Sequence, residues 1–117
     1  MTVRKILTLI DDIRPNTATE ETKLSWICTL EKIIIDYMTM YSETDTKYSS
    51  LTVDSETALG DEYANMYAYY GVYMLDLKNM DISMYNNSLA LFNTLFVSWQ
   101  KKWRREHLPQ KRKRGDS

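Results

Sequence analysis

The stretch ISMYNNSLALFNTLFVSWQKKW, residues 82–103, decides the fold, because its apolar and aromatic side chains recur at alternating spacings of three and four. Such spacing places them on one face of an α-helix. The members of this aromatic seam are Ile82, Tyr85, Leu89, Phe92, Phe96, Trp99 and Trp103. The pattern predicts a helix over residues 81–107, about 40 Å long at 1.5 Å per residue. A helix of this length exceeds the core of a small domain, so we expect its outer stretch to project and to be covered by other chains.

Three further segments have apolar residues at helical spacing. They are residues 2–13, 18–41 and 61–79. Residues 42–59 break the periodicity and predict a long loop, rich in Ser, Thr, Asp and Glu. The fold is therefore expected to be all-α, a small bundle of about four helices with a long projecting C-terminal helix.

Capping residues mark the ends of these segments. Thr2 is the expected N-cap of the first helix, and Pro15 should end it near Ile13, because proline disfavours helix at the residue before it. Thr17 and Thr19 both fit the N-cap of the second helix. In the same way, Asp61 is expected to cap the third helix and Asp81 the fourth.

The composition excludes several other classes of protein. Three glycines and two prolines in 117 residues are too few for a turn-rich β-sandwich or barrel. The single cysteine, Cys28, cannot form an intrachain disulfide. The longest uninterrupted run of apolar and aromatic residues, 66–70, is far shorter than the roughly 20 residues of a membrane span. With 44% hydrophobic residues the chain can bury a core, and we expect one helical domain at 1–107 followed by a basic tail at 108–117.

Charge is distributed unevenly along the chain. Residues 101–117 contain eight of the fifteen basic side chains and two acidic ones, a net charge of +6. The first 100 residues carry seven basic and fourteen acidic side chains, a net charge of −7. An acidic body with a basic end predicts an oriented electrostatic contact, with nucleic acid or with an acidic protein surface.

Few residues in this chain are suited to catalysis. The only histidine, His107, stands among basic residues at the edge of the tail, and Cys28 lies inside an apolar helical segment. The adjacent pairs at 11–12 and 20–21 diverge on a helix instead of converging on one ion. We therefore expect no enzyme activity, no catalytic residues, no cofactor and no metal site.

A second apolar stripe on the second helix indicates a partner. Trp26, Ile33 and Met40 recur every seven residues, on a different side from the main stripe. A partner chain would cover them, although a central helix covered by its own neighbours explains them equally well. Residues 47–53 could also pair as a short strand in an assembly. The candidate subunit-interface residues are therefore Trp26, Ile33, Met40, Tyr48, Leu51 and Val53.

Two blocks of sequence resemble the small head–tail connector, or adaptor, proteins of tailed bacteriophages. The first block comprises residues 11–16 (DDIRPN), 19–27 (TEETKLSWI) and 30–31 (LE). The second comprises residues 63–70 (YANMYAYY), 76–77 (DL), 84–93 (MYNNSLALFN) and 103–107 (WRREH). The likeness extends over about four-fifths of the chain, and neither block is a catalytic signature.

The resemblance implies a structural virion protein of the phage neck, assembled in the host cell cytoplasm and not bound to a membrane. It implies a homo-oligomeric ring, expected to be a dodecamer, that joins the portal protein to a tail-side stopper or tail completion protein. DNA would pass through the ring without sequence-specific binding. Residues 99–114 would dock on the portal, with the two tryptophans as anchors. The candidate portal-binding residues are Trp99, Lys102, Trp103, Arg104, Arg105, Lys111, Arg112, Lys113 and Arg114.

A different function remains open on the same features. The basic tail would also suit a small helical nucleic-acid-binding regulator, with affinity that falls steeply with salt. In either case we expect the isolated protein to be a monomer in dilute solution.

Overall fold

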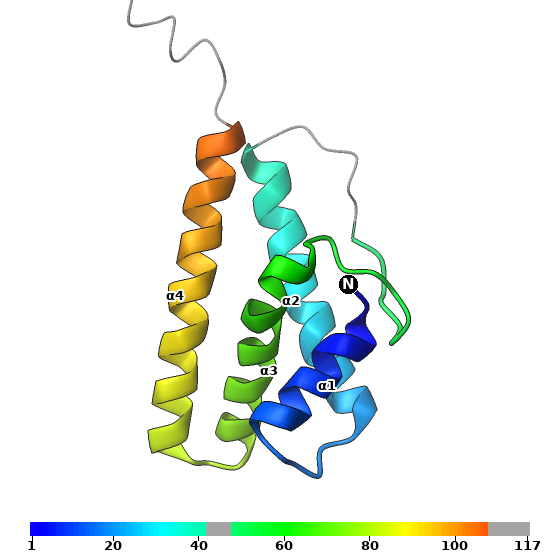
Figure 1. The fold of residues 1–117 in the computed structure, drawn as a ribbon, viewed down its shortest axis with the longest axis vertical. Coiled ribbons are helices and arrows are strands. Elements are labelled where there is room, and N and C mark those ends of the chain that lie inside the picture. The colour runs from blue at the N-terminus through cyan, green and yellow to red at the C-terminus, as the bar shows by residue number, and fades with distance from the viewer. Residues whose placement is uncertain (42–47, 108–117) are drawn as a thin grey trace, which may run out of the picture.

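Four α-helices and one short 3-10 turn form the described part of the chain, residues 1–41 and 48–107 of a computed structural model. The elements are α1 (Val3–Ile13), α2 (Glu20–Tyr41), η1 (Asp61–Tyr63), α3 (Ala64–Lys78) and α4 (Ile82–His107). Helix α3 lies in the middle and packs against each of the other three helices (Figure 1). The predicted all-α fold of four helices is confirmed, and none of the described residues belongs to a strand.

Local sequence signals set both ends of α1. The Thr2 hydroxyl accepts a hydrogen bond from the Lys5 backbone N–H at 3.3 Å, with Thr2 in an extended conformation. The helix ends at Ile13, and Arg14 is already extended, at φ −136° and ψ 94°. Because Pro15 follows, Arg14 cannot easily remain helical. The predicted N-cap and the predicted end of this helix are both confirmed.

Of the two threonines that fit the N-cap of α2, Thr19 occupies this position and Thr17 does not. The Thr19 hydroxyl accepts a hydrogen bond from the Thr22 backbone N–H at 3.1 Å. Glu20 and Glu21 then occupy the first turn, where carboxylates interact favourably with the helix dipole. The helix consequently starts at residue 20 instead of 18, and it ends at Tyr41 as predicted.

The described part of the long loop runs back along the N-terminus. The Val3 backbone N–H donates to the Ser55 carbonyl at 3.0 Å, and the Arg4 N–H donates to the Val53 carbonyl at 2.8 Å. These bonds satisfy two N–H groups of the first turn of α1, which have no partner within the helix. The short strand considered for residues 47–53 is not formed by residues 48–53 of this chain. Residues 42–47 lie outside the described residues.

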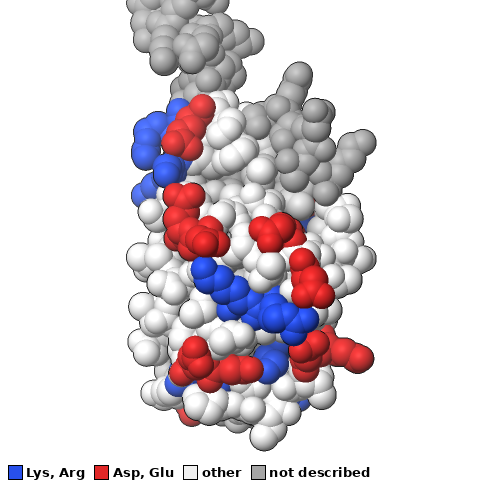
Figure 2. Space-filling view, turned by 45° about the vertical axis from the view of Figure 1, so that its right-hand side comes forward, with Lys and Arg blue, Asp and Glu red and all other residues white. Residues whose placement is uncertain are grey.

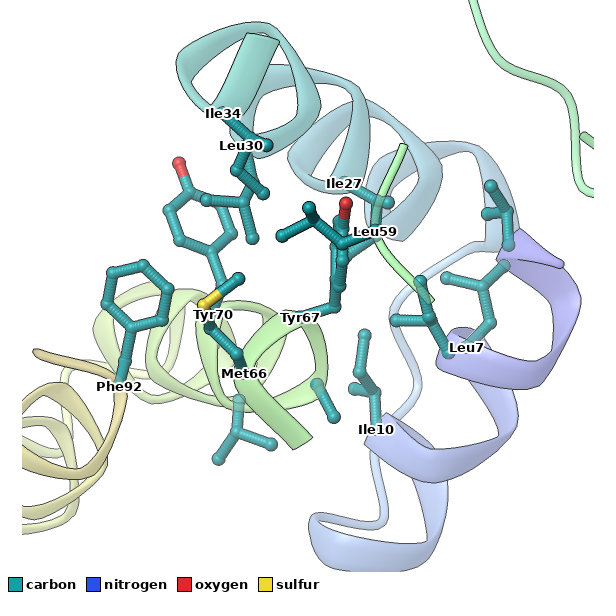
Figure 3. Packing of buried hydrophobic residues seen from close by; sticks show 14 of the residues in the cluster. Leu7, Ile10, Ile27, Leu30, Ile34, Leu59, Met66, Tyr67, Tyr70 and Phe92 are labelled. Carbon is teal, nitrogen blue, oxygen red and sulfur yellow. The ribbon is translucent and has the colours of Figure 1, made fainter. Parts of the chain in front are cut away.

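Helix α3 is buried on several sides because it is surrounded by the other helices. Figure 3 shows side chains of α1, α2 and α4 directed toward those of α3. Gly71 allows the closest approach, since a Cβ atom there would lie 2.9 Å from Cγ1 of Ile10. The fully or almost fully buried core includes Val3, Ile6, Ile10, Ile27, Leu30, Ile34, Met66, Tyr67, Ala68, Val72 and Leu75.

Two details predicted for the third helix are wrong. Leu77, which shares the helical spacing of the apolar residues in 61–79, is exposed, whereas Val72 and Leu75 are buried. A helix that is covered on three sides does not follow a single stripe. Asp61 is also not the cap, because Gly60 precedes η1 in the capping position without a side-chain hydrogen bond. The Asp61 carboxylate instead pairs with the Lys5 ammonium at 3.2 Å, which holds the pKa of Asp61 below its ordinary value.

A three-residue joint reverses the chain between α3 and α4. The Asn79 and Met80 backbone N–H groups donate to carbonyls at the end of α3, and Met80 adopts a positive φ of 57°. The Asp81 carboxylate then accepts a hydrogen bond from the Met84 N–H at 3.1 Å. This bond confirms Asp81 as the N-cap of α4, which reaches His107 as predicted.

The aromatic seam of α4 faces the rest of the chain, and its C-terminal half does not project alone. Trp99 is only 3% exposed, and its ring lies 5.3 Å from that of Tyr37 in α2. The Tyr37 hydroxyl donates to the carbonyl of Gln100 at 3.3 Å. Figure 1 shows the C-terminal ends of α2 and α4 side by side. The expectation that other chains must cover Trp99 is therefore wrong, because α2 supplies that cover.

Candidate assembly and docking surfaces

The predicted portal-binding residues divide into buried and exposed groups. Trp99 belongs to the hydrophobic core, so it is not available as an anchor in this conformation. Trp103 is half-buried, and the ring of His107 stacks on it at a centroid distance of 3.6 Å. Lys102, Arg104 and Arg105 are exposed. The other candidates, Lys111, Arg112, Lys113 and Arg114, lie outside the described residues.

The exposed basic residues cover the outer side of the last turns of α4. Lys101, Lys102, Arg104 and Arg105 are all exposed, and none of them forms an ion pair with another described residue. At about 100° per residue, they spread over the side of the helix opposite the aromatic seam. Figure 2 shows Lys and Arg side chains gathered at this end of the molecule, with acidic side chains next to them.

Arg104 also approaches the packing between α2 and α4. Burial raises the pKa of the Tyr37 hydroxyl, and the positive charge of Arg104 acts in the opposite direction. The basic end of α4 is therefore attached to the body through Tyr37, next to Trp99. A partner that binds this end would meet a surface that the core holds in place.

The apolar stripe on α2 is exposed where it was predicted to meet a partner. Ile33 is 43% exposed and Met40 is 69% exposed, whereas Trp26 is half-buried against the core. The central helix, which packs against each of the other three, is α3 and not α2. The alternative that α2 is covered on all sides by its own neighbours is thus wrong for Ile33 and Met40.

The structure separates the six candidate interface residues into two surfaces. Leu51 approaches the Cys28 side of α2, where its carbonyl lies 4.0 Å from the Cys28 sulfur. The ring of Tyr48 lies near the Lys32 ammonium, at 5.8 Å. Ile33 is five residues beyond Cys28, about 140° further round the helix. Tyr48 and Leu51 therefore lie on a different flank of α2 from Ile33 and Met40.

Val53 is also apart from the stripe, because its carbonyl binds the Arg4 backbone N–H at the start of α1. Like Leu51, it is partly buried against the core of its own chain. Cys28 is half-buried and packs beneath this segment. Leu51 and Val53 therefore stabilise the packing of their own loop against the body in this conformation.

Three charged side chains are buried although the sequence did not predict their burial, and each is paired with a residue distant in the sequence. The Glu31 carboxylate accepts hydrogen bonds from the Tyr67 hydroxyl and the Ala58 N–H, both at 2.6 Å. The Lys23 ammonium lies 2.7 Å from Asp11. The third is Asp76, which joins three helices. Helical periodicity does not reveal such pairs, since each looks like an interruption of an apolar stripe.

The described residues hold no cluster of three or more His, Cys, Asp or Glu side chains that could bind a metal ion. None of the helices in these ranges is long and apolar enough to cross a membrane. Comparisons with protein-family models, curated proteins and solved structures found no match to the chain. What these surfaces bind must therefore be inferred from the exposed apolar residues of α2 and the exposed basic residues of α4.

Proposed function

We propose that the chain is a structural protein of a phage neck, an adaptor that forms a ring between the portal protein and tail-side proteins around the DNA channel. The proposal is supported by the sequence resemblance and by one structural observation. Exposed apolar residues lie on α2, while exposed basic residues that form no ion pair with another described residue lie on the end of α4. A ring subunit needs separate surfaces for its neighbours and for the ring beneath it.

In this proposal the contact with neighbouring subunits includes Ile33 and Met40, and Trp26 supports it from beneath. The basic end of α4, with Lys102, Arg104 and the half-buried Trp103, faces the portal. Since Trp99 is in the core, it positions this end and does not touch the portal. The acidic remainder of the chain would let DNA pass without adhering, because phosphate binding depends on lysine and arginine.

The test is binding to the portal protein encoded in the same genome. The double variant Arg104→Ser/Arg105→Ser should bind the portal ring more weakly and with a flatter dependence on salt, because it removes two screened charges. Deletion of residues 108–117 should have the same kind of effect. The control is Arg4→Ser, which removes an exposed arginine of α1 that pairs with Asp54. Equal affinity and equal salt dependence in all variants would contradict the proposal.

A small nucleic-acid-binding regulator is the second candidate function. The observation that favours it is the group of unpaired cations on the outer side of α4, which continues into the basic tail. A gel-shift titration of the full chain with duplex DNA at low salt tests it. A complex that weakens steeply with added salt would support this function. No complex at low salt would remove it.

A further inference from the structure

Three large apolar side chains are exposed at the corner between α3 and α4. Met80 is 81% exposed, Ile82 63% and Leu77 47%. All three fall within six residues, and the Met80 N–H is bonded to the Leu77 carbonyl at 3.0 Å. We call these three residues the apolar corner. A cluster of large exposed apolar side chains indicates an interaction site more strongly than isolated ones do.

A groove lies at the opposite end of the same two helices. It comprises two hollows of about 250 and 170 Å³, between residues 58–63 and the C-terminal half of α4. Both hollows are lined by Glu62, Tyr63, Trp99 and Lys102, so they form one continuous depression. The depression has room for one or two side chains of a partner.

One of the residues that line the groove carries a buried hydrogen-bond donor without a partner. The Trp103 indole N–H is buried and has no acceptor among the described residues. An unsatisfied buried donor is unfavourable and is uncommon in folded proteins.

The charges around the corner and the groove are complementary. Lys78 and Asp81 flank the apolar corner, whereas Glu62, Lys102 and Glu106 line the groove. None of these five exposed side chains forms an ion pair with another described residue. Lys78 can therefore meet the carboxylates of the groove while Asp81 meets Lys102.

We propose that the apolar corner of one copy of this chain inserts into the groove of a second copy. The corner joins the end of α3 to the start of α4, and the groove lies at the start of α3 and the end of α4, so one molecule cannot fill its own groove (Figure 1). The contact uses two different surfaces, is head-to-tail, and repeats from copy to copy. Being small, it is weak and forms only at high protein concentration.

Two substitutions test the contact without disturbing the core. Met80→Gly removes the most exposed side chain of the corner and suits the positive φ at that position. Gly60→Phe places a ring at the groove, where the backbone is extended and an added Cβ would meet only Glu62 Oε1, at 3.8 Å. The matched controls are Met80→Leu, which keeps an apolar corner, and Gly60→Ala, which leaves the groove open.

Sedimentation velocity of the full chain from about 10 μM to about 1 mM gives the readout. The average mass of the wild type and both controls should rise with concentration, while Met80→Gly and Gly60→Phe should remain monomeric. An equimolar mixture of these two variants should form dimers and nothing larger, because only one intact corner and one intact groove remain per pair. A monomeric wild type, unchanged association in either variant, or a mixture that stays monomeric would overturn the proposal.

This contact is distinct from the ring proposed above, in which Lys102 and Trp103 of the groove face the portal, and it is tested separately. A chain that associates through the corner and the groove, yet does not bind a portal ring, keeps this inference and removes the proposed function. A chain that binds the portal ring equally well with Met80→Gly or Gly60→Phe keeps the function and places the subunit contact on α2 instead.

Discussion

Arg14 and Asp76 form an ion pair across 62 positions of the chain, with Nε 2.9 Å from Oδ1 and Nη2 3.2 Å from Oδ2. The Asp76 carboxylate is buried and also accepts a hydrogen bond from the Ser88 hydroxyl at 2.8 Å. Arg14 follows α1, Asp76 belongs to α3, and Ser88 belongs to α4. One carboxylate therefore connects α3 and α4 to the residue that follows α1.

Removal of either member of this pair should destabilise the protein strongly. Arg14→Ala leaves a buried carboxylate with one hydroxyl donor, and we expect the free energy of unfolding to fall by about 3 kcal/mol. Urea denaturation at neutral pH measures it. The control is Lys32→Ala, which breaks an exposed pair with Asp36 and should cost less than about 0.5 kcal/mol. Equal losses in the two variants would show that the Asp76 network contributes no more than a surface pair.

Stability should fall steeply in alkaline solution because two tyrosines resist ionisation in the folded state. Burial raises the pKa of Tyr67, and the adjacent Glu31 carboxylate raises it further. Burial and the neighbouring Tyr70 likewise raise the pKa of Tyr73. Above pH about 10 the unfolded chain loses these protons while the folded chain keeps them. The folded state is therefore favoured below this pH and loses stability above it.

Each such tyrosine contributes a loss of about 1.4 kcal/mol per pH unit. The measurement is the free energy of unfolding in urea at several pH values from about 9 to about 11, compared for the wild type and Tyr67→Phe. The variant should lose about 1–3 kcal/mol at neutral pH, because Glu31 loses a donor. Its stability should then fall less steeply above pH about 10 than that of the wild type. If the free energy of unfolding falls equally steeply with pH in both proteins, the alkaline loss of stability does not come from Tyr67.

The close approach of α1 to α3 predicts a strong effect at Gly71. Gly71→Ala would place a Cβ against Cδ1 of the fully buried Ile10, and also 2.9 Å from its Cγ1. Overpacking of this kind costs about 1–3 kcal/mol, and Ile10→Val removes Cδ1, the nearest of these atoms. Gly60→Ala is the matched control, with an expected change within about 0.5 kcal/mol. The double variant Gly71→Ala/Ile10→Val should be more stable than the sum of the single changes predicts. Strict additivity would mean that Ile10 is not the obstacle.

The helices and their ends were predictable because their signals are local. Thr2 and Asp81 act as N-caps, and Pro15 ends α1, within one turn of the residues that they affect. The side on which a helix is buried depends on its neighbours instead. Leu77 has the spacing of a core residue, yet it lies at the end of α3 and is exposed. Trp99 looked unprotected only because periodicity cannot reveal the Tyr37 ring beside it.

The candidate surfaces were predictable to the same limited extent. The seven-residue spacing of Ile33 and Met40 indicated an exposed stripe, and both residues are exposed. Tyr48 and Leu51 could not be assigned to another flank of α2, since their position depends on how the loop returns to the body. The apolar corner was missed because Met80 belongs to a joint and to no periodic pattern.

The backbone of Met80 is strained, because a residue other than glycine rarely adopts the left-handed region. A non-glycine residue there costs about 1–2 kcal/mol, whereas glycine adopts it readily. Since the Met80 side chain is almost fully exposed, its removal sacrifices little packing. Met80→Gly should therefore raise the free energy of unfolding by about 0.5–1 kcal/mol, measured in urea at a concentration where the chain is monomeric. Met80→Ala, which removes the side chain but keeps the strain, should bring no gain. A gain of equal size in both variants would assign the effect to the lost side chain, and a loss in the glycine variant would show that Met80 makes contacts that its exposure conceals.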